Sequence, residues 1–418
     1  MPPGTTPWRR ARAAALLVAL VFAISCDRAQ PGASFDVVRD TLPNGAIAIH
    51  YSGLPDSTTV PLGYDLKLGM VEGDPNEIFG DIRAVEVDRD GNIYILDYQT
   101  SEVRVFYANG SYLRTLTRNG RGPSELVAAN GMILTPGDTL WIQDHGQWRL
   151  LAIDLEGREL TQMPMPVRSY GYIWDGAIDE RGRHWSHASH SDAPRVFPPE
   201  LGLNEGSGRA YLVWYDPATD ARDSTLVGER TYQSYVSRND QGGHTYRQIP
   251  MSPNPMVLVD PSGGFWTTTG AGYSLTYRGE GGDTLLTVDV AIIPDSVTSA
   301  DRRSFIDGVL RSSPDDVRVA EEIAALMPAV KPAVDHILLD DEGRLWVRRR
   351  LDEDRVTRYD VFSREGEFLD VVLLDFLPAQ YFPPRIRDGR LYTIVRDEFD
   401  VQSVVRTEPL QIGRAAPR

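Results

Sequence analysis

Residues 84–94 read AVEVDRDGNIY, and variants of this pattern recur five more times along the 418-residue chain. Each copy has an apolar strand, an Asp, a turn that contains Gly and a short strand that carries an aromatic residue. Gly adopts positive φ without a steric penalty and Asp favours tight turns, so each copy predicts a β-hairpin. The aromatic residues of the six copies are Tyr94, Trp141, Trp185, Trp266, Trp346 and Tyr392.

A second hairpin follows the first in the clearest copies, for example over residues 103–106 and 112–116. Two successive hairpins make four antiparallel strands, which is one blade of a β-propeller. Three of the five intervals between the aromatic residues match the roughly 40–50 residues of one blade. We interpret the two longer intervals as insertions: a loop rich in Pro, Gly and Ser after Trp185, and a helical segment over about 299–327. The predicted fold class is all-β, a six-bladed β-propeller with a small helical insertion.

The sequence also predicts how the propeller closes. Residues 65–68 and 75–78 parallel residues 112–115 and 123–126, which we assign to the outer strand of blade one and its crossover to blade two. Residues 65–68 should then be the outer strand of blade six, because the C-terminal repeat that forms this blade ends after three strands. Closure by this N-terminal strand would remove the exposed sheet edges.

These repeats resemble a known family. The run from Ala84 through Asp97 to Phe106 resembles the NHL repeat, and residues 60–412 resemble the NHL-like six-bladed β-propeller lipoproteins of bacteria. The resemblance is specific in blades one, two and five and looser in the other three. It implies the fold and a place in the cell envelope, but no particular reaction, because most members of that group have no known activity.

Residues 1–25 are predicted to be a lipoprotein signal peptide. Three arginines precede an apolar run over 13–24, which is too short to span a bilayer but has the length of a signal sequence core. The run ends AISC at Cys26, the only cysteine, and this ending resembles a lipobox. Acylation would remove a free thiol that is a liability in an exported chain. We therefore predict a lipid on Cys26; an ordinary signal peptide with a chance cysteine is the alternative.

Behind the anchor, residues 26–35 are predicted to be a flexible tether, 36–412 the propeller and 413–418 a disordered tail. The expected location is the bacterial cell envelope, periplasmic or on the outer surface, with the membrane contacted through the lipid. The net charge of -16 argues against a nucleic-acid partner, because phosphate contacts need clustered Lys and Arg.

No signature of catalysis stands out: we find no Gly-rich phosphate loop, Cys pair or Gly-x-Ser-x-Gly elbow. Asp97 and Asp144 recur at matching places of blades one and two, which favours a turn-capping role over a pair of catalytic carboxylates. His184 occupies an apolar position of the repeat and is predicted to be a core residue. We expect no cofactor. His187 and His190 are weak candidates for a divalent metal site, which would require a loop that brings them together.

The long connections predict a ligand face. In a propeller, the connections between blades share a face with those between second and third strands, so insertions at 186–210, 229–254 and 294–333 should lie on one face around blades three to five. Long loops on a rigid scaffold commonly carry binding sites. The residues that we expect on this ligand face are Arg168, Tyr172, His187, His190, His244 and Tyr246.

The sequence thus favours a membrane-anchored, non-enzymatic binding or scaffold propeller, with a protein, peptide or carbohydrate as its ligand. The alternative is a metal-dependent propeller enzyme of the lactonase or lyase type. Polar ligands on the inner strands would favour the enzyme. Residues 256–259 and 337–339 read as apolar, and on that basis we predict binding rather than catalysis.

Overall fold

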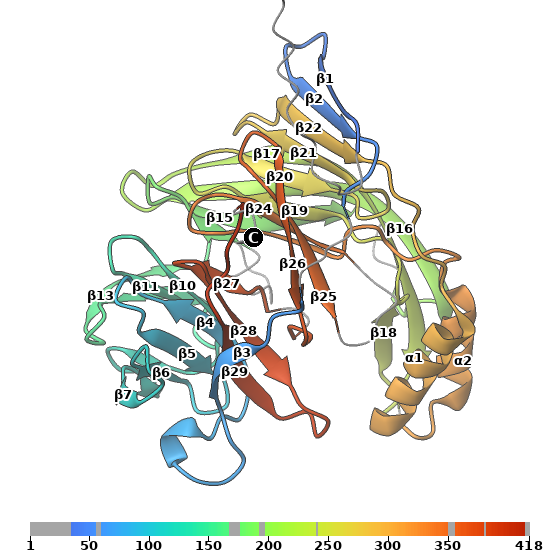
Figure 1. Ribbon diagram of the computed structural model, residues 1–418. Helices are drawn as coiled ribbons and strands as arrows, with labels where there is room; N and C mark the ends of the chain where they lie inside the picture. The colour runs from blue at the N-terminus through green and yellow to red at the C-terminus, as the bar shows by residue number, and fades with distance from the viewer. Residues whose placement is uncertain are drawn as a thin grey trace, which may run out of the picture. The chain divides into compact units, whose positions relative to one another are not determined.

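Six antiparallel blades follow one another along the chain in the computed structural model (Figure 1). The structure describes residues 35–55, 60–166, 176–191, 197–239, 241–349, 356–379 and 382–413, and these belong to one compact unit. Cys26, Arg168 and Tyr172 lie outside the described residues. No helix within these ranges is long and apolar enough to cross a membrane.

Blades one, two and five each contain four consecutive strands. Blade one consists of β4 (Ile82–Val87), β5 (Ile93–Asp97), β6 (Glu102–Phe106) and β7 (Tyr112–Thr115). Blade two consists of β10 (Ala129–Leu134), β11 (Leu140–Asp144), β12 (Arg149–Ile153) and β13 (Glu159–Pro164). Blade five consists of β23 (His336–Leu339), β24 (Leu345–Arg349), β25 (Thr357–Phe362) and β26 (Phe368–Leu374). Between blades one and two lies a short parallel pair, β8 (Arg118–Asn119) and β9 (Glu125–Leu126).

Blade six takes its outer strand from the N-terminal part of the chain. Its first three strands are β27 (Arg385–Arg387), β28 (Arg390–Arg396) and β29 (Gln402–Thr407). The fourth is β3 (Tyr64–Leu68), which pairs antiparallel with β29 and precedes a short 3-10 helix, η1 (Pro75–Glu77). β3 therefore lies beside β29, the last strand of the chain in the described residues, as the sequence repeat predicts.

The aspartate of the repeat explains why the pattern folds locally. Asp340 accepts hydrogen bonds from two backbone N–H groups of its own turn, at 3.0 and 2.8 Å, and from the indole N–H of Trp346 at 2.8 Å. Asp179 holds Trp185 in the same way, also at 2.8 Å. Gly343 has φ of +76° in this turn, where a side chain would be strained. In the copies of blades one, three and five, one carboxylate thus fixes both the turn and the buried aromatic ring.

Buried clusters join each blade to the next. Clusters shared by blades one and two, three and four, four and five, five and six, and six and one each contain buried side chains from both partners. Blades two and three meet where the ring of Trp141 packs edge-on against His184, with centroids 4.4 Å apart. His184 is buried, as predicted for its repeat position, and burial lowers its pKa to about 4.

Blade three differs from the sequence prediction. Its strands are β14 (Ala177–Ile178), β15 (His184–Ser191), β16 (Gly202–Asp216), β17 (Ala221–Arg238) and β18 (His244–Gln248). The expectation of a loop over 186–210 is wrong for most of that range, because β15 continues to Ser191 and β16 begins at Gly202. The Gly and Ser residues that suggested a loop lie inside β16, where an extended β17 pairs with them.

Blade four gains two strands that the sequence did not reveal. Its own strands are β19 (Met256–Val259), β20 (Phe265–Thr268), β21 (Ser274–Arg278) and β22 (Thr284–Val290). The N-terminal hairpin of β1 (Val37–Thr41) and β2 (Ile47–Tyr51) extends this sheet, with β2 parallel to β22. Residues 36–51 are therefore an integral part of the fold.

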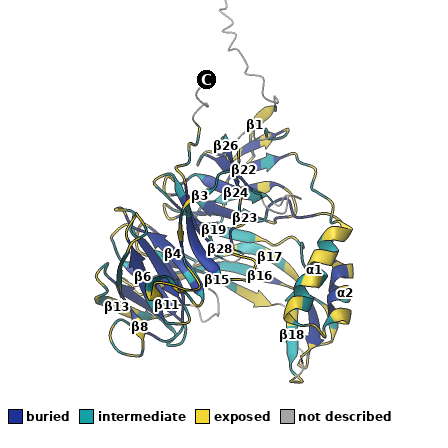
Figure 2. Ribbon diagram, turned by 60° about the horizontal axis from the view of Figure 1, so that its bottom comes forward, coloured by how far each residue is buried: buried dark blue, intermediate teal, exposed yellow. Residues whose placement is uncertain are grey.

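The predicted helical insertion is confirmed as two helices, α1 (Ser299–Ser312) and α2 (Val317–Leu326). Thr298 begins α1 with a capping box: its hydroxyl accepts from the Asp301 N–H, while the Asp301 carboxylate accepts from the Thr298 N–H. None of the α1 side chains is buried, whereas α2 buries one face that includes Val319 and Ile323 (Figure 2). The pair of helices thus packs through α2.

Candidate functional site

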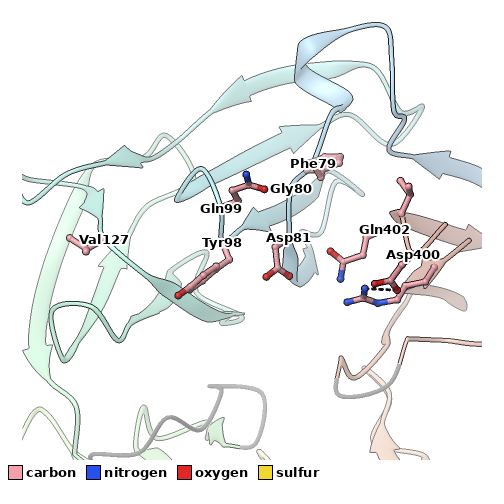
Figure 3. Close-up of a pocket in the computed structure, with 10 residues that line it drawn as sticks. Phe79, Gly80, Asp81, Tyr98, Gln99, Val127, Asp400 and Gln402 are labelled. Carbon is pink, nitrogen blue, oxygen red and sulfur yellow. Dashed lines mark hydrogen bonds and ion pairs between the residues drawn. The ribbon is translucent and has the colours of Figure 1, made fainter. Parts of the chain in front are cut away.

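A cavity of about 760 Å³, which we call the mouth cavity, lies between blades one and six (Figure 3). Its walls come from the connection that precedes β4, the turn after β5 and the turn between β28 and β29. The main lining side chains are Phe79, Asp81, Tyr98, Gln99, Arg396, Asp400 and Gln402. All three segments are connections between blades or between second and third strands, so by the propeller rule they share the face of the insertions.

Asp97 shapes one wall of this cavity. Its buried carboxylate accepts hydrogen bonds from the backbone N–H groups of Gly80 at 3.0 Å, Asp81 at 3.1 Å and Gln99 at 3.0 Å. Asp144 binds the matching connection of blade two, at Val127 and Ala128. Both carboxylates thus bind backbone N–H groups of the connection into their own blade, and the predicted capping of the next turn is confirmed for Asp97.

Charged side chains around the mouth cavity are paired with one another. The Asp81 carboxylate lies 2.5 Å from the Arg83 guanidinium, which also stacks 4.6 Å from the centre of the Tyr98 ring. Across the cavity, Arg396 and Asp400 form an ion pair at 2.8 Å. The walls therefore combine balanced charges with aromatic rings.

Two glutamines supply amide groups to the same cavity. The Gln402 side chain accepts from the Ile82 N–H at 2.6 Å and donates to the Ile82 carbonyl at 3.3 Å, which locks it in place. Gln99 is exposed, and its side chain lies so close to Gly80 that a Cβ there would overlap it. Glycine at position 80 therefore leaves room for the Gln99 amide at the cavity wall.

The inner strands carry more charge than the sequence analysis expected. Glu86 on β4 pairs with Arg385 on β27 at 2.9 Å, and burial raises the pKa of the Glu86 carboxyl. On blade five, burial lowers the pKa of His336 to about 3, and the adjacent Asp335 pairs with Arg348 at 2.7 Å. Residues 256–259 and 337–339 are apolar as the sequence analysis read them, and the charges lie at other positions; Glu86 and Arg385 neutralise one another across two blades, and Asp335 and Arg348 do so within blade five.

Four of the predicted ligand-face residues lie in the described part of the chain, all of them in blade three. His187 and His190 lie on opposite faces of β15, which is a continuous strand, so no loop brings them together. His187 lines a separate cavity of about 310 Å³ between blades three and four. His244 and Tyr246 lie on β18. His244 contacts the ring of Phe197, and Tyr246 is 60% exposed.

Two of the predicted insertions pack firmly together. Tyr235 on β17 donates a hydrogen bond to Glu322 on α2, and Arg247 on β18 forms a 2.6 Å ion pair with Asp316. A buried cluster that includes Tyr235, Ile249, Val319 and Ile323 lies beside these contacts. The helices therefore brace the extended end of blade three.

The part of the chain that the structure describes contains no preformed metal site. No group of three or more His, Cys, Asp or Glu residues there is arranged to hold a metal ion. The mouth-cavity residues were not singled out from the sequence, because they come from three separate parts of the chain. Only Tyr98 and Gln99 carry a local signal, which is their position directly after Asp97 in the repeat.

The comparisons with known proteins agree with this architecture. Residues 74–173 match the model of the family DUF5128, described as a 6-bladed beta-propeller. This region contains blades one and two and one side of the mouth cavity. None of the curated proteins matches the sequence. The chain is a six-bladed β-propeller.

Several solved structures are similar to most of the chain at low sequence identity. A member of the duf4221 family from Bacteroides vulgatus is 11% identical, with a TM-score of 0.47, 85% of this chain covered and 98% of that one. A putative exported protein from Bacteroides fragilis is 9% identical, with a TM-score of 0.40 and coverage of 84% and 100%. A streptogramin B lyase is 8% identical, with a TM-score of 0.40 and coverage of 82% and 97%.

Proposed function

We propose that this protein is a non-enzymatic binding propeller, held at the bacterial cell envelope by a lipid on Cys26, that captures a carbohydrate in the mouth cavity. The observation that carries the proposal is the composition of this cavity. Its charges are balanced by Asp81–Arg83 and Arg396–Asp400 ion pairs, so it offers hydrogen bonds without a net charge to attract an ion.

Neutral sugars suit such a surface. A sugar hydroxyl both donates and accepts hydrogen bonds, and so do the side-chain amides of Gln99 and Gln402. The rings of Phe79 and Tyr98 add apolar faces against which a sugar ring can pack. A volume of about 760 Å³ is within the range of small-molecule sites, about 300–1,000 Å³. A short oligosaccharide would therefore fit.

The insertions extend the proposed ligand face. The helices brace blade three through Arg247 and Asp316, and we assign to this platform the role of a wall that contacts a longer ligand. His187, His190, His244 and Tyr246 remain proposed contributors from blade three. Of these, Tyr246 is the most open to contact a ligand ring, because it is 60% exposed.

The test is a screen of neutral oligosaccharides on an array, followed by calorimetric titration of the full chain in non-ionic detergent. Replacing Gln99 with Ala should weaken binding about three- to tenfold, since a lost hydrogen bond costs about 0.5–1.5 kcal/mol. Gln233, an exposed glutamine on β17 that bonds only Glu205 among the described residues, is the matched control and should tolerate the same change.

Two outcomes would contradict the proposal. One is an array on which no neutral oligosaccharide binds. The other is an oligosaccharide whose affinity falls equally in the Gln99 and Gln233 variants. Metal analysis of the purified chain addresses the lactonase- or lyase-like alternative separately: a stoichiometric metal together with turnover of a lactone or peptide would replace binding with catalysis.

A further inference from the structure

The cavity between blades three and four is built differently from the mouth cavity. It has a volume of about 310 Å³, at the small end of the range for ligand sites. Strands β15, β16 and β17 form one wall, and β19, β20 and β21 form the other. A molecule of monosaccharide size would fill it.

Strand register places two basic groups on the same wall. His187 pairs with Leu212, and Leu212 pairs with Thr225, so these three side chains lie on one face of the sheet. Arg230 pairs with Gly208, beyond the bulge near residue 210, and lies on the same face. The Thr225 hydroxyl donates to the Glu280 carbonyl of blade four at 2.7 Å, so this face is turned toward blade four. Burial lowers the pKa of His187 to about 4, and the nearby positive charge of Arg230 adds to this effect.

The opposite wall supplies a second guanidinium. Arg278 lines the cavity from β21 and donates through one terminal nitrogen to the Gly282 carbonyl at 3.0 Å. Among the described residues, its buried Nε has no hydrogen-bond partner, and neither has the buried Nε2 of His187. A buried polar atom without a partner costs about 1–3 kcal/mol, so both atoms favour a ligand that would satisfy them.

Charge in this cavity is not balanced as it is in the mouth cavity. Among the described residues, neither Arg230 nor Arg278 forms an ion pair with a carboxylate. Glu229 also lines the cavity, but it pairs with Arg209 and His190 and so takes a register position on the opposite face. The wall that faces blade four is therefore positively charged.

The rest of the lining consists of hydroxyl and apolar groups. Hydroxyls come from Ser189, Thr269, Ser274 and Thr276, and a small apolar floor from Met256 and its neighbours. We propose that this cavity binds a small hydroxylated carboxylate, a sugar acid or an acid of similar size. The planar guanidinium groups match a carboxylate, which accepts two parallel N–H donors from one arginine. The hydroxyls then bind the remainder of the ligand.

The probe is D-glucuronate, titrated into the full chain in non-ionic detergent by calorimetry, with D-glucose as the neutral counterpart and inorganic phosphate as a second anion. Glucuronate should bind at least tenfold more tightly than glucose, and phosphate should not displace it. Replacing Arg230 with Gln should weaken glucuronate binding at least tenfold, because a hydrogen bond to a charged group is lost.

Arg222→Gln is the matched control, since Arg222 lies on the same strand but is exposed and paired with Asp220. It should bind glucuronate as tightly as the unmodified chain. Thermal melting shows whether Arg230→Gln is folded; if it is not, His187→Gln takes its place and should also weaken binding. Gln99→Ala should leave glucuronate binding unchanged, which separates this site from the mouth cavity.

Three results would overturn the assignment. Absence of glucuronate binding is the first. The second is displacement by phosphate, or a glucose affinity that equals the glucuronate affinity and is lowered as much by Arg230→Gln, because either removes the carboxylate as the recognised group. Equal losses in the Arg230 and Arg222 variants are the third, because they would place the anion elsewhere on the surface.

Discussion

Replacing Leu68 with Ala should destabilise the whole propeller, because this side chain is where the N-terminal strand enters the core. Leu68 is 2% exposed and belongs to a buried cluster that joins blades six and one, with Ile82, Tyr392 and Val404 among its members. Truncation of a buried Leu to Ala costs about 2–5 kcal/mol, and more where the surroundings cannot collapse into the space. Because the sheets of blades six and one surround Leu68, they can move little into the space that truncation leaves. We therefore expect the free energy of unfolding to fall by about 3–4 kcal/mol.

The assay is calorimetric melting of the full chain in non-ionic detergent. For a folded unit of this size that unfolds in one transition, the entropy of unfolding is roughly 0.8 kcal/mol per K, from about 2.1 cal/mol/K per residue. The expected decrease in Tm is therefore about 4–5 °C. Lys67→Ala is the control, because Lys67 is exposed on the same strand and its loss should cost less than about 0.5 kcal/mol.

Equal decreases in Tm for the Leu68 and Lys67 variants would refute this reasoning, as would an unchanged Tm for Leu68→Ala. A more severe change tests the same point. Deleting residues 60–70 removes β3 and leaves the edge of β29 unpaired, so the truncated chain should aggregate or lose cooperative unfolding. A truncated chain that stays monomeric and melts normally would show that β3 does not hold blade six closed.

Two other predictions concern the anchor and pH. Cys26→Ala should release the chain from the membrane fraction or stall its processing, as followed by fractionation and immunoblotting; a variant that matures and pellets as before would rule out the lipid anchor. His184 has a pKa of about 4 in the folded chain, against about 6.5 when unfolded, so the unfolded state binds the extra proton and stability falls as pH drops from about 6.5 to 4. Urea unfolding at pH 7 and pH 5 should show His184→Phe losing about 1.8 kcal/mol less stability over this range than the unmodified chain; identical losses would contradict this.

The number of blades was predictable because its determinants are local. The carboxylate, the turn and the aromatic ring of one copy lie within seven residues, as in Asp340 to Trp346, and they contact one another directly. Such a unit forms its contacts whatever follows it in the chain. The two long intervals proved to be insertions for the same reason, since neither contains a further copy of the repeat.

The strands that the sequence missed depend on distant partners. The hairpin of β1 and β2 is positioned by β22, more than 200 residues away, and all five residues of β1 are exposed. Without a buried face, its sequence gives no alternating pattern to read. In blade three, Gly206 and Gly208 suggested a loop, but Tyr232 lies over Gly206 and fills the space that its missing side chain leaves.

The candidate sites were hidden for a related reason. The mouth cavity combines residues near 80, 98 and 400, and nothing local marks that these three turns meet. The charges on inner strands, such as Glu86 and Arg385, look costly in isolation and become acceptable only as a pair. Chemistry that depends on pairs from different blades therefore requires the arrangement of the blades.

The N-terminal segment does more than complete blade six. After β2 extends blade four, the Tyr51 hydroxyl donates to the Gly366 carbonyl of blade five at 2.9 Å, and Arg358 donates to the Pro55 carbonyl at 2.9 Å. Leu62 then bridges to Leu374 at the outer strand of blade five, before β3 joins blade six. Because these residues contact three blades in turn, detaching them would break contacts with three sheets, beginning with the pairing of β2 and β22.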